Sequence, residues 1–582
     1  MLGFFRLFRA AALVLLLIVA SFAWAVESVG GTVYLYASPT TAQYMLSQRQ
    51  SYEQVVKRWR AYLKKYGTQA RFVTREQLIA GVKPPGVLIL PTAIALDKEE
   101  RSAIQRFTAQ GGSLLGSGLV GTRGADGEQA GLDFLQETFH VRARGFFPET
   151  DDSFFMPFGD GPVTWPIPAG RRMPMVSQKD SVLRIEAENI ASEVMDWSRT
   201  AQTVANGVMA FSETAVSRLV YFSFADTAWP YSKDVVLVLD AAIAWLRREP
   251  QAYKSAWPNG YVASQLIEMD TEDKFASALN FAKHLESEEF KGTFYSLTSE
   301  AALVPNVVRE LLGRGHEIAY HADVHFGFKG DSQGEQELRI RFMKQQMQGI
   351  VGERIAEVTG FRAPTESYDG TTESLLRKHG LLHHAADESA GEDRLPFFSV
   401  SERGIPHDKA LVVLPRTQLD DINFRDLKFT PAQVNSNLAY YLDLTVRSGA
   451  FGLLSVHSQN YVAGGLMMVT MGEFIKKVAT YRDRLWVARG DEITAWWRQR
   501  EGVQVEQALQ SKVLRVSLRS ESPVPVHGLT VFVTLPYKNA PVQIAPVSSG
   551  GKVRVKSIDP FRVALIFDSV LPGSTNVNVT FP

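Results

Sequence analysis

The sequence predicts a multidomain α/β protein that ends in a small all-β domain. Over residues 32–250, and again over 261–500, short β-rich runs alternate with segments that have the apolar spacing of helices. Such alternation is typical of parallel sheets that are covered by helices on both faces. After Trp496 and Trp497 the pattern changes to short strands separated by Pro, Gly, Ser and Asn, which predicts an antiparallel β-sandwich over 503–582.

Residues 1–25 have the pattern of a secretory signal peptide. Arg6 and Arg9 precede an apolar run over 10–24, and Ala23-Trp24-Ala25 provides a small-x-small cleavage site. An uncleaved membrane anchor is the alternative, but the run is short beside the ~20 residues of a spanning helix. We therefore expect an exported, periplasmic protein that has no stable membrane span after cleavage.

The composition excludes several classes of function. Lys and Arg together number 62, as do Asp and Glu, and this balance argues against nucleic acid or an anionic membrane as the main partner. The chain of 582 residues contains no Cys, which rules out disulfides, thiolate metal sites and cysteine nucleophiles. Any catalytic site must therefore be built from other side chains.

Residues 27–250 are expected to form a doubly wound parallel sheet. The predicted strands lie at 33–36, 70–73, 87–90, 113–115 and 218–224. Asp97 is the predicted N-cap of a helix that Gly111-Gly112 ends. The order strand, Pro, helix, Gly-Gly, strand, Gly-Ser-Gly resembles the class I glutamine amidotransferase-like fold. That family has a Cys nucleophile after this strand, whereas Ser117 stands here without an identifiable His–acid pair, so we expect a non-catalytic domain.

Carboxylates and imidazoles follow two β-type runs of the second α/β region. The run 262–269 ends in Asp270-Thr271-Glu272-Asp273, and the run 317–320 leads into His321 and His325. Imidazole nitrogen and carboxylate oxygen are the ligands of a catalytic zinc-type site that keeps one coordination position for water. A His pair at this spacing is common by chance, so its value depends on the residues around it.

Residues 261–500 resemble the NodB-type polysaccharide deacetylases, carbohydrate esterase family 4. Five motifs of that family have counterparts in the expected order, after predicted strands wherever the sequence permits one to be assigned. The counterparts lie at 270–273, 321–325, 360–364, 386–389 and 453–457. The resemblance implies a distorted (β/α) barrel with its chemistry at the carboxyl ends of the strands.

The resemblance also implies roles for the first two motifs. Asp270 would be the general base and Glu272 a metal ligand, with Asp273 as the alternative ligand because the spacing of the acids departs from the commonest form. His321 and His325 would complete the protein ligands of a divalent metal. Zinc is the default for such a ligand set, and cobalt or nickel are also compatible.

The third and fourth motifs would orient the base. Arg362 would pair with Asp270 and with a later acid, which the resemblance places at Asp387, and would keep the base ionised. Two positions depart from the family pattern. Ala322 replaces the usual Ser or Thr after the first His, and the aromatic residue expected after Asp387 is absent.

The fifth motif and the Pro of the third would contact the substrate. The resemblance implies that Leu454 lines the pocket for the acetyl methyl group, that Pro364 is a second substrate-binding residue, and that His457 protonates the departing amine. The sequence therefore favours an exported, metal-dependent hydrolase that removes N-acetyl groups from a glycan.

The domain order also resembles the C-terminal part of Pel-type exopolysaccharide deacetylases, by analogy of architecture. That resemblance implies a hexosamine-containing exopolysaccharide as substrate and export proteins as partners. Peptidoglycan is the competing glycan. Two other interpretations stay open: a catalytically degenerate, glycan-binding scaffold of an export machine, or an amidase that acts on a peptide or small molecule. Stoichiometric zinc would favour an enzyme over a scaffold.

Overall fold

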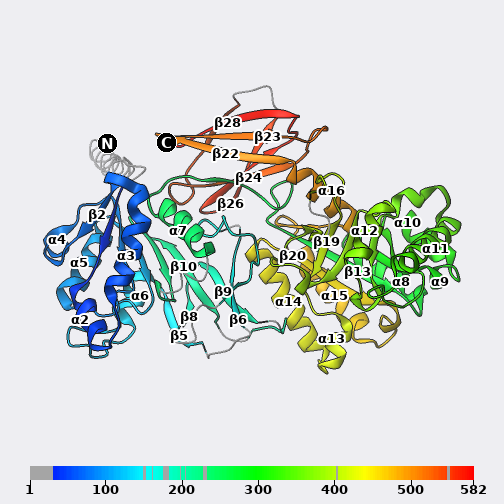
Figure 1. The fold of residues 1–582 in the computed structure, drawn as a ribbon, viewed down its shortest axis with the longest axis horizontal. Coiled ribbons are helices and arrows are strands. Elements are labelled where there is room, and N and C mark those ends of the chain that lie inside the picture. Colours follow the sequence, from blue (N-terminus) through cyan, green and yellow to red (C-terminus); the bar gives the residue numbers. More distant parts are fainter. Residues whose placement is uncertain are drawn as a thin grey trace, which may run out of the picture.

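A computed structural model describes residues 31–147, 153–159, 161–174, 182–196, 198–202, 205–226, 233–400, 404–546 and 551–582. The predicted signal peptide over 1–25 lies outside the described residues. Within them, no helix is long and apolar enough to cross a membrane. The chain forms an N-terminal and a central α/β region, followed by a C-terminal region of β-sheets (Figure 1).

The N-terminal region is built on parallel strands covered by helices. The strands are, in spatial order, β2 (Ala70–Val73), β1 (Thr32–Tyr36), β3 (Gly86–Leu90), β4 (Ser113–Ser117) and β11 (Arg218–Phe222). Leu35 of β1 packs in one core cluster with Trp59 of α3 (Tyr52–Leu63), whereas Tyr36 packs in another with Phe107 of α5 (Lys98–Ala109). The other helices are α2 (Pro39–Ser47), α4 (Arg75–Gly81), α6 (Asp133–Phe139) and α7 (Lys233–Leu246). Helices therefore cover both faces of this parallel part.

The same sheet continues in antiparallel strands that the sequence analysis did not predict. They are β10 (Gly207–Glu213), β9 (Ile190–Asp196), β6 (Ser153–Pro157) and β7 (Met173–Pro174), with β8 (Leu183–Glu186) and β5 (Arg142–Phe146) beside them. The expected doubly wound parallel sheet is therefore corrected to a mixed sheet. β9 and β10 are buried at nearly every position, so they lack the alternation of apolar and polar residues that identifies a half-buried strand in a sequence.

The central region is a curled, mostly parallel sheet. Its parallel strands are, in order, β19 (Val412–Arg416), β17 (His383–Asp387), β16 (Gly360–Arg362), β15 (Glu317–Ala322), β14 (Thr293–Leu297), β13 (Ala263–Thr271) and β20 (Phe451–His457). β18 (Phe397–Phe398) pairs antiparallel with β19, and β21 (Leu485–Val487) joins β13. Near the ends of the curl, Thr417 Oγ1 donates to the carbonyl of Phe451 and accepts from the N–H of Leu453. The predicted distorted barrel is thus a curled half-barrel.

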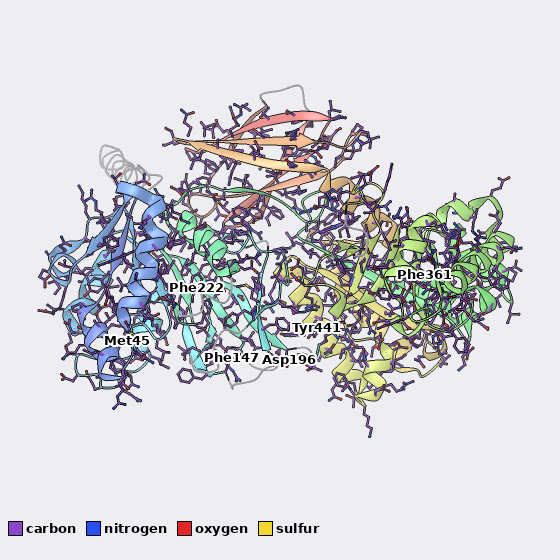
Figure 2. All side chains as sticks on the ribbon, in the orientation of Figure 1. Met45, Phe147, Asp196, Phe222, Phe361 and Tyr441 are labelled. Carbon is purple, nitrogen blue, oxygen red and sulfur yellow. The ribbon has the colours of Figure 1, made fainter. Side chains whose placement is uncertain are left out.

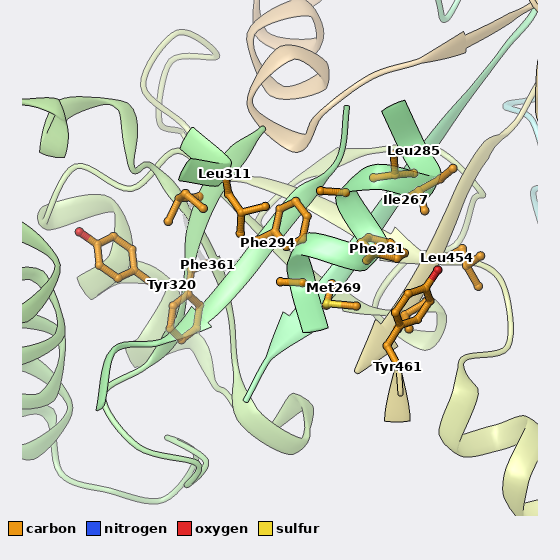
Figure 3. Packing of buried hydrophobic residues seen from close by; sticks show 14 of the residues in the cluster. Ile267, Met269, Phe281, Leu285, Phe294, Leu311, Tyr320, Phe361, Leu454 and Tyr461 are labelled. Carbon is orange, nitrogen blue, oxygen red and sulfur yellow. The ribbon is translucent and has the colours of Figure 1, made fainter. Parts of the chain in front are cut away.

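Helices cover the outer face of this half-barrel. They include α8 (Ala278–Glu286), α10 (Pro305–Gly313), α11 (Gln333–Val351), α12 (Gly370–Lys378), α14 (Pro431–Ser448) and α15 (Leu466–Ala479). On β13, Ile267 packs with Phe281 of α8 in the outer core (Figure 3), whereas Leu266 belongs to a different cluster. Because side chains alternate along a strand, Glu268 and Asp270 share the face of Leu266, inside the curl.

Two antiparallel sheets form the C-terminal region. One has the order β12 (Ala252–Lys254), β24 (Leu529–Thr534), β27 (Arg562–Phe567) and β26 (Val553–Asp559). The other has the order β22 (Val503–Gln510), β23 (Val513–Ser520), β28 (Gly573–Thr580) and β25 (Gln543–Pro546). Val516 of β23 and Leu565 of β27 belong to one buried cluster, which also contains Trp496 of α16 (Gly490–Glu501). The predicted linker over 250–260 therefore supplies an edge strand, β12.

The antiparallel extension of the N-terminal sheet packs on the central region. Phe154 and Met156 of β6 and Met195 of β9 form a buried cluster with Tyr441 and Leu444 of α14. Figure 2 labels Tyr441 of α14 and Asp196, the last residue of β9, at this boundary. The interface is apolar at its centre, so the two regions form a continuous packed unit.

Candidate metal centre and active site

Glu272, His321 and His325 meet at one rim of the central sheet. Glu272 directly follows β13, His321 is near the end of β15, and His325 lies in the loop after it. The carboxyl ends of β13, β14 and β15 lie together because these are neighbouring parallel strands. Glu272 Oε1 lies 3.3 Å from His321 Nε2 and 3.1 Å from His325 Nε2. Asp273, the alternative ligand, is exposed and lies outside this group.

The donor atoms of these three residues fit a divalent cation. His321 Nδ1 lies 3.0 Å from the carbonyl oxygen of Arg362, and because a carbonyl only accepts, Nδ1 carries the proton and Nε2 the lone pair. That Nε2 is buried and has no hydrogen-bond partner among the described residues. One ligand atom from each of the three side chains lies within 4.8 Å of the other two. Two imidazole nitrogens and a carboxylate oxygen are a ligand set that suits zinc, cobalt or nickel.

Glu272 is held as a carboxylate. Its Oε2 accepts from Gln459 Nε2 at 2.5 Å, and its N–H donates to Ser458 Oγ at 2.9 Å. Burial raises the pKa of Glu272, but the contact with His321 and the positive charge that the nearby imidazoles carry when protonated outweigh burial and lower this pKa to about 2. An ionised oxygen therefore faces the two imidazoles at neutral pH.

Ala322 ends β15 in a strained conformation. Its φ of +104° lies in the left-handed region that residues other than Gly rarely adopt. The pairing of β14 with β15 shifts register at the same point. The Ala322 methyl group belongs to the buried apolar cluster outside the sheet, so a hydroxyl group there would need a polar partner. This packing accounts for a residue without a hydroxyl group at this position.

Asp270 lies at the same rim, inside the curl. Its side chain is buried, and its Oδ2 lies 3.0 Å from Nε of Arg362 and 3.6 Å from Nε2 of His457. Its Oδ1 has no hydrogen-bond partner among the described residues. One carboxylate oxygen is therefore anchored, and the other is free to accept a proton.

Arg362 binds more acids than the sequence predicted. Besides Asp270, it contacts the buried Glu268 of β13 and, at 3.1 Å, Glu366 Oε1. Burial lowers the pKa of Arg362, but Asp270 and Glu268 outweigh burial and raise this pKa above its usual range. Glu366 reaches back because Thr365 and Glu366 both have φ +54° after the buried Pro364. The guanidinium is thus permanently charged and fixed from three sides.

The predicted direct pairing of Arg362 with Asp387 is wrong. Asp387 Oδ2 lies 3.4 Å from Nη2 of Arg416 and 3.5 Å from Nη1 of Arg199, a residue of the N-terminal region. Arg416 Nε in turn lies 3.3 Å from Glu366, which is the link to Arg362. Glu268 occupies the place foreseen for Asp387 because it is two residues before Asp270 and shares its face of β13. The sequence signal for it was an acid two residues before Asp270 within the same strand.

His457 stands opposite Asp270 in the pairing of β20 with β13. Its Nδ1 donates to Asp421 Oδ1 at 2.6 Å, and its N–H donates to Asp421 Oδ2 at 3.3 Å. Asp421 begins the helix α13 (Asp421–Asp426) and also accepts from Asn460 at 2.8 Å. Burial lowers the pKa of His457, but Asp421 and then Asp270 outweigh burial and raise it to about 9. Asp421 was not predicted from the sequence, because adjacent aspartates at the start of a helix are only a weak signal.

Leu454 does not line the acetyl pocket, contrary to the prediction. Side chains alternate along β20, so Leu454, three residues before His457, lies on the opposite face. It is fully buried in the cluster that contains Ile267, outside the sheet (Figure 3). Ser455 shares the face of His457 instead. Pro364 is buried directly after the segment of Arg362, and its contact with substrate stays a prediction.

The other polar clusters have structural partners. Ser117 is buried, donates to Asp226 Oδ1 at 2.9 Å and accepts from the N–H of Thr92 at 3.0 Å, with no His among its described partners. His383 and His384 each lie against a buried glutamate. The polar groups of these clusters are hydrogen-bonded or ion-paired to one another. None of the clusters places a nucleophile beside a His that could act as its base.

Comparison with known proteins identifies the central region. Residues 276–383 match the model of the polysaccharide deacetylase family, a segment that contains His321, His325 and Arg362. No curated protein matches the chain significantly.

Among solved structures, Agd3, a carbohydrate deacetylase, is similar at 11% identity over 94% of this chain and 98% of that chain, with a TM-score of 0.42. A family 4 carbohydrate esterase from Streptomyces lividans in complex with acetate is similar at 16% identity over 40% and 93%, with a TM-score of 0.27. A family 4 pseudoenzyme from Bacillus anthracis is similar at 12% identity over 42% and 68%, with a TM-score of 0.30. The resemblance found in the sequence motifs is confirmed: the central region of the chain carries a polysaccharide deacetylase domain.

Proposed function

We propose that the protein is a metal-dependent deacetylase that removes N-acetyl groups from a glycan. The observation that carries this proposal is the meeting of Glu272, His321 and His325 with Asp270 and His457 at one rim of the sheet. The family match of the central region supports the same activity. A degenerate scaffold would have no need to keep a complete ligand set beside a base and an acid.

Glu272, His321 and His325 would hold the metal. When bound, a divalent cation such as zinc supplies Lewis-acid polarisation of the acetamide carbonyl and makes water more acidic. The His325 side chain is 44% exposed, whereas that of His321 is 2% exposed, so the group is open to solvent on the His325 side. A chain-like substrate can therefore approach from that side.

Asp270 would act as the general base. Its anchored Oδ2 is held by Arg362, so the free Oδ1 keeps one orientation in which it can take the proton of the attacking water. Arg362 is itself held by Glu268 and Glu366, so it keeps Asp270 in this position. A base that is fixed in this way needs no reorientation before the proton transfer.

His457 would act as the general acid. Asp421 accepts the Nδ1–H, which leaves Nε2–H on the side of Asp270 and of the reacting atoms. With its raised pKa, His457 is protonated at neutral pH. It would give its Nε2 proton to the nitrogen as the C–N bond breaks, so that an amine and acetate leave.

The substrate class follows from the sequence rather than from the site. The pattern of residues 1–25 favours an exported protein in the periplasm, and the domain order favours a hexosamine exopolysaccharide, with export proteins as partners. Peptidoglycan is the competing substrate. Both are N-acetylated polymers, so they require the same chemistry at the metal centre.

Acetate release tests the proposal. Purified protein is incubated with soluble N-acetylhexosamine oligomers, with peptidoglycan fragments and with a simple acetylated peptide, each with and without a chelator. We expect zinc-dependent acetate release from the oligomers and none from Asp270→Asn. Release from the peptide alone would instead support an amidase. No release from any substrate by fully zinc-loaded protein would contradict the proposal.

A further inference from the structure

A large aromatic side chain is exposed directly beside the metal centre. Phe326 follows His325 in sequence and is 73% exposed. Its N–H donates to the carbonyl of Val324 at 2.8 Å, which closes a three-residue turn centred on His325. Val324 is also exposed, at 39%. The rim around this ligand is therefore apolar, although exposed apolar side chains cost solvation free energy.

The loop that carries Phe326 is fixed by one arginine. Arg339 of α11 donates to the carbonyl oxygens of Gly327 at 2.6 Å and of Phe326 at 2.8 Å, and its Nε donates to Asp323 at 3.0 Å. The same guanidinium lies 4.0 Å from the ring centroid of Phe328. These contacts hold the loop on both sides of His325.

The far end of the loop is packed against the turn that follows Arg362. Phe328 is fully buried, and its N–H donates to the carbonyl of Ser367 at 2.7 Å. At Gly327, a Cβ atom would lie 2.3 Å from Ser367 Oγ, so the backbone approaches this turn as closely as only Gly permits. The exposed ring of Phe326 is therefore presented from an anchored backbone.

We propose that Phe326 is a platform on which a sugar ring of the glycan stacks, next to the residue that is deacetylated. This inference rests on the proposed function, because it takes the glycan as the molecule that reaches the rim. The apolar C–H face of a pyranose ring covers an aromatic face without loss of the hydrogen bonds of its hydroxyl groups to water. An anchored platform also gives up little conformational entropy on binding.

If Phe326 is such a platform, its effect on affinity should depend on the number of sugar residues in the ligand. A single N-acetylhexosamine would need to occupy only the site of the metal ligands and the base, and would not have to reach Phe326. An oligomer extends beyond this site and covers the ring. Phe326 should therefore contribute to the binding of oligomers and not of monosaccharide.

Calorimetric binding to the zinc-loaded Asp270→Asn protein tests this, because that protein binds ligand without turnover. We expect Phe326→Ala to weaken binding of a tetramer of N-acetylglucosamine about tenfold, in line with the burial of part of an aromatic side chain, and Phe326→Trp to preserve it. Monosaccharide affinity should be the same in all variants. Phe72→Ala is the matched control, since Phe72 is 51% exposed in the N-terminal region.

Equal tetramer affinity in Phe326→Ala and its parent would overturn the platform. So would a tetramer loss that is matched by Phe72→Ala, or one that is equal for the monosaccharide. Absence of tetramer binding by the zinc-loaded Asp270→Asn protein itself would also overturn the platform. The proposed deacetylase activity is judged separately, by acetate release from the native enzyme, so either idea can fail without the other.

Discussion

The Nδ1 atom of His457 lies 2.6 Å from Oδ1 of Asp421, which joins the end of β20 to the first turn of α13. This contact raises the pKa of His457 against the effect of burial and fixes which ring nitrogen faces Asp270. His457 and Asp270 thus occupy neighbouring strands with their side chains 3.6 Å apart, and His457 is protonated at neutral pH.

The first prediction concerns pH. His457 must be protonated to act as the acid, so kcat/KM should fall as the pH rises through about 9. Asp421→Asn removes the charge that raises this pKa, so the alkaline limb should move to lower pH, toward the ordinary imidazole value of ~6.5. A pH profile of acetate release checks this. Asp426→Asn, at an exposed position of the same helix, is the control. An alkaline limb that stays in place in Asp421→Asn would contradict the assignment.

The second prediction concerns the buried acid below the base. Glu268→Ala removes one of the three acids that hold the buried guanidinium of Arg362, and a buried donor that loses its partner costs ~1–3 kcal/mol. We expect the free energy of unfolding of metal-free protein, measured in denaturant, to fall by that order. Glu268→Gln keeps an acceptor for Arg362 and should lose less. Glu268→Ala that unfolds at the same denaturant concentration as native protein would show that Arg362 does not depend on Glu268.

The third prediction concerns the loop of His325. Arg339→Ala removes the hydrogen bonds that hold this loop, so the zinc dissociation constant should rise about 10- to 100-fold, as for other residues that orient metal ligands. Arg341→Ala is a matched control on the same helix, because Arg341 is exposed and pairs with Glu337. Zinc titration with a competing chromophoric chelator measures both. Equal zinc affinity in the two variants would exclude this role of Arg339.

The fourth prediction concerns domain boundaries. A fragment that begins at Trp257 lacks β12, the edge strand of the C-terminal sheets, whereas one that begins at Pro250 keeps it. Both fragments lose the strands of the N-terminal region that pack on Tyr441 and Leu444. We therefore expect both to melt below the full chain by circular dichroism, and the Trp257 fragment to melt lowest. Equal melting temperatures of the two fragments would show that β12 contributes no stability.

The features that depend on short stretches of sequence, namely the strands and the motif residues at their ends, were predicted. The five motif segments end parallel strands or follow them, so their carboxyl ends had to meet at one rim, and the spacing of Asp270 and Glu272 placed both acids there. The contacts Asp421–His457 and Glu366–Arg362 depend on long-range packing and on a left-handed turn, which no local pattern specifies. Leu454 was assigned by motif position, although strand alternation places it on the outer face.

The N-terminal sheet shows a second limit. Its parallel strands are short β-rich runs and were predicted. The antiparallel strands between 142 and 213 were not: β9 and β10 have seven residues each without regular polar–apolar alternation, and register shifts interrupt the pairing of β9 with β10 and of β5 with β8. Whether such a segment forms a strand depends on the strand with which it pairs, and that strand can lie far away in the sequence. These unpredicted strands form the contact with α14, so the interface of the two regions was missed with them.

Zinc content and acetate release, measured on the same preparations of native protein, Asp270→Asn, Glu272→Ala and Asp273→Ala, test the central claim most directly. Native protein and Asp273→Ala should hold one zinc per chain and release acetate. Asp270→Asn should hold the same zinc and lose turnover by ~10²–10⁴-fold, since its amide cannot take a proton. Glu272→Ala should lose zinc and activity together. Full zinc occupancy in Glu272→Ala, or loss of zinc in Asp273→Ala, would contradict the site described for this chain.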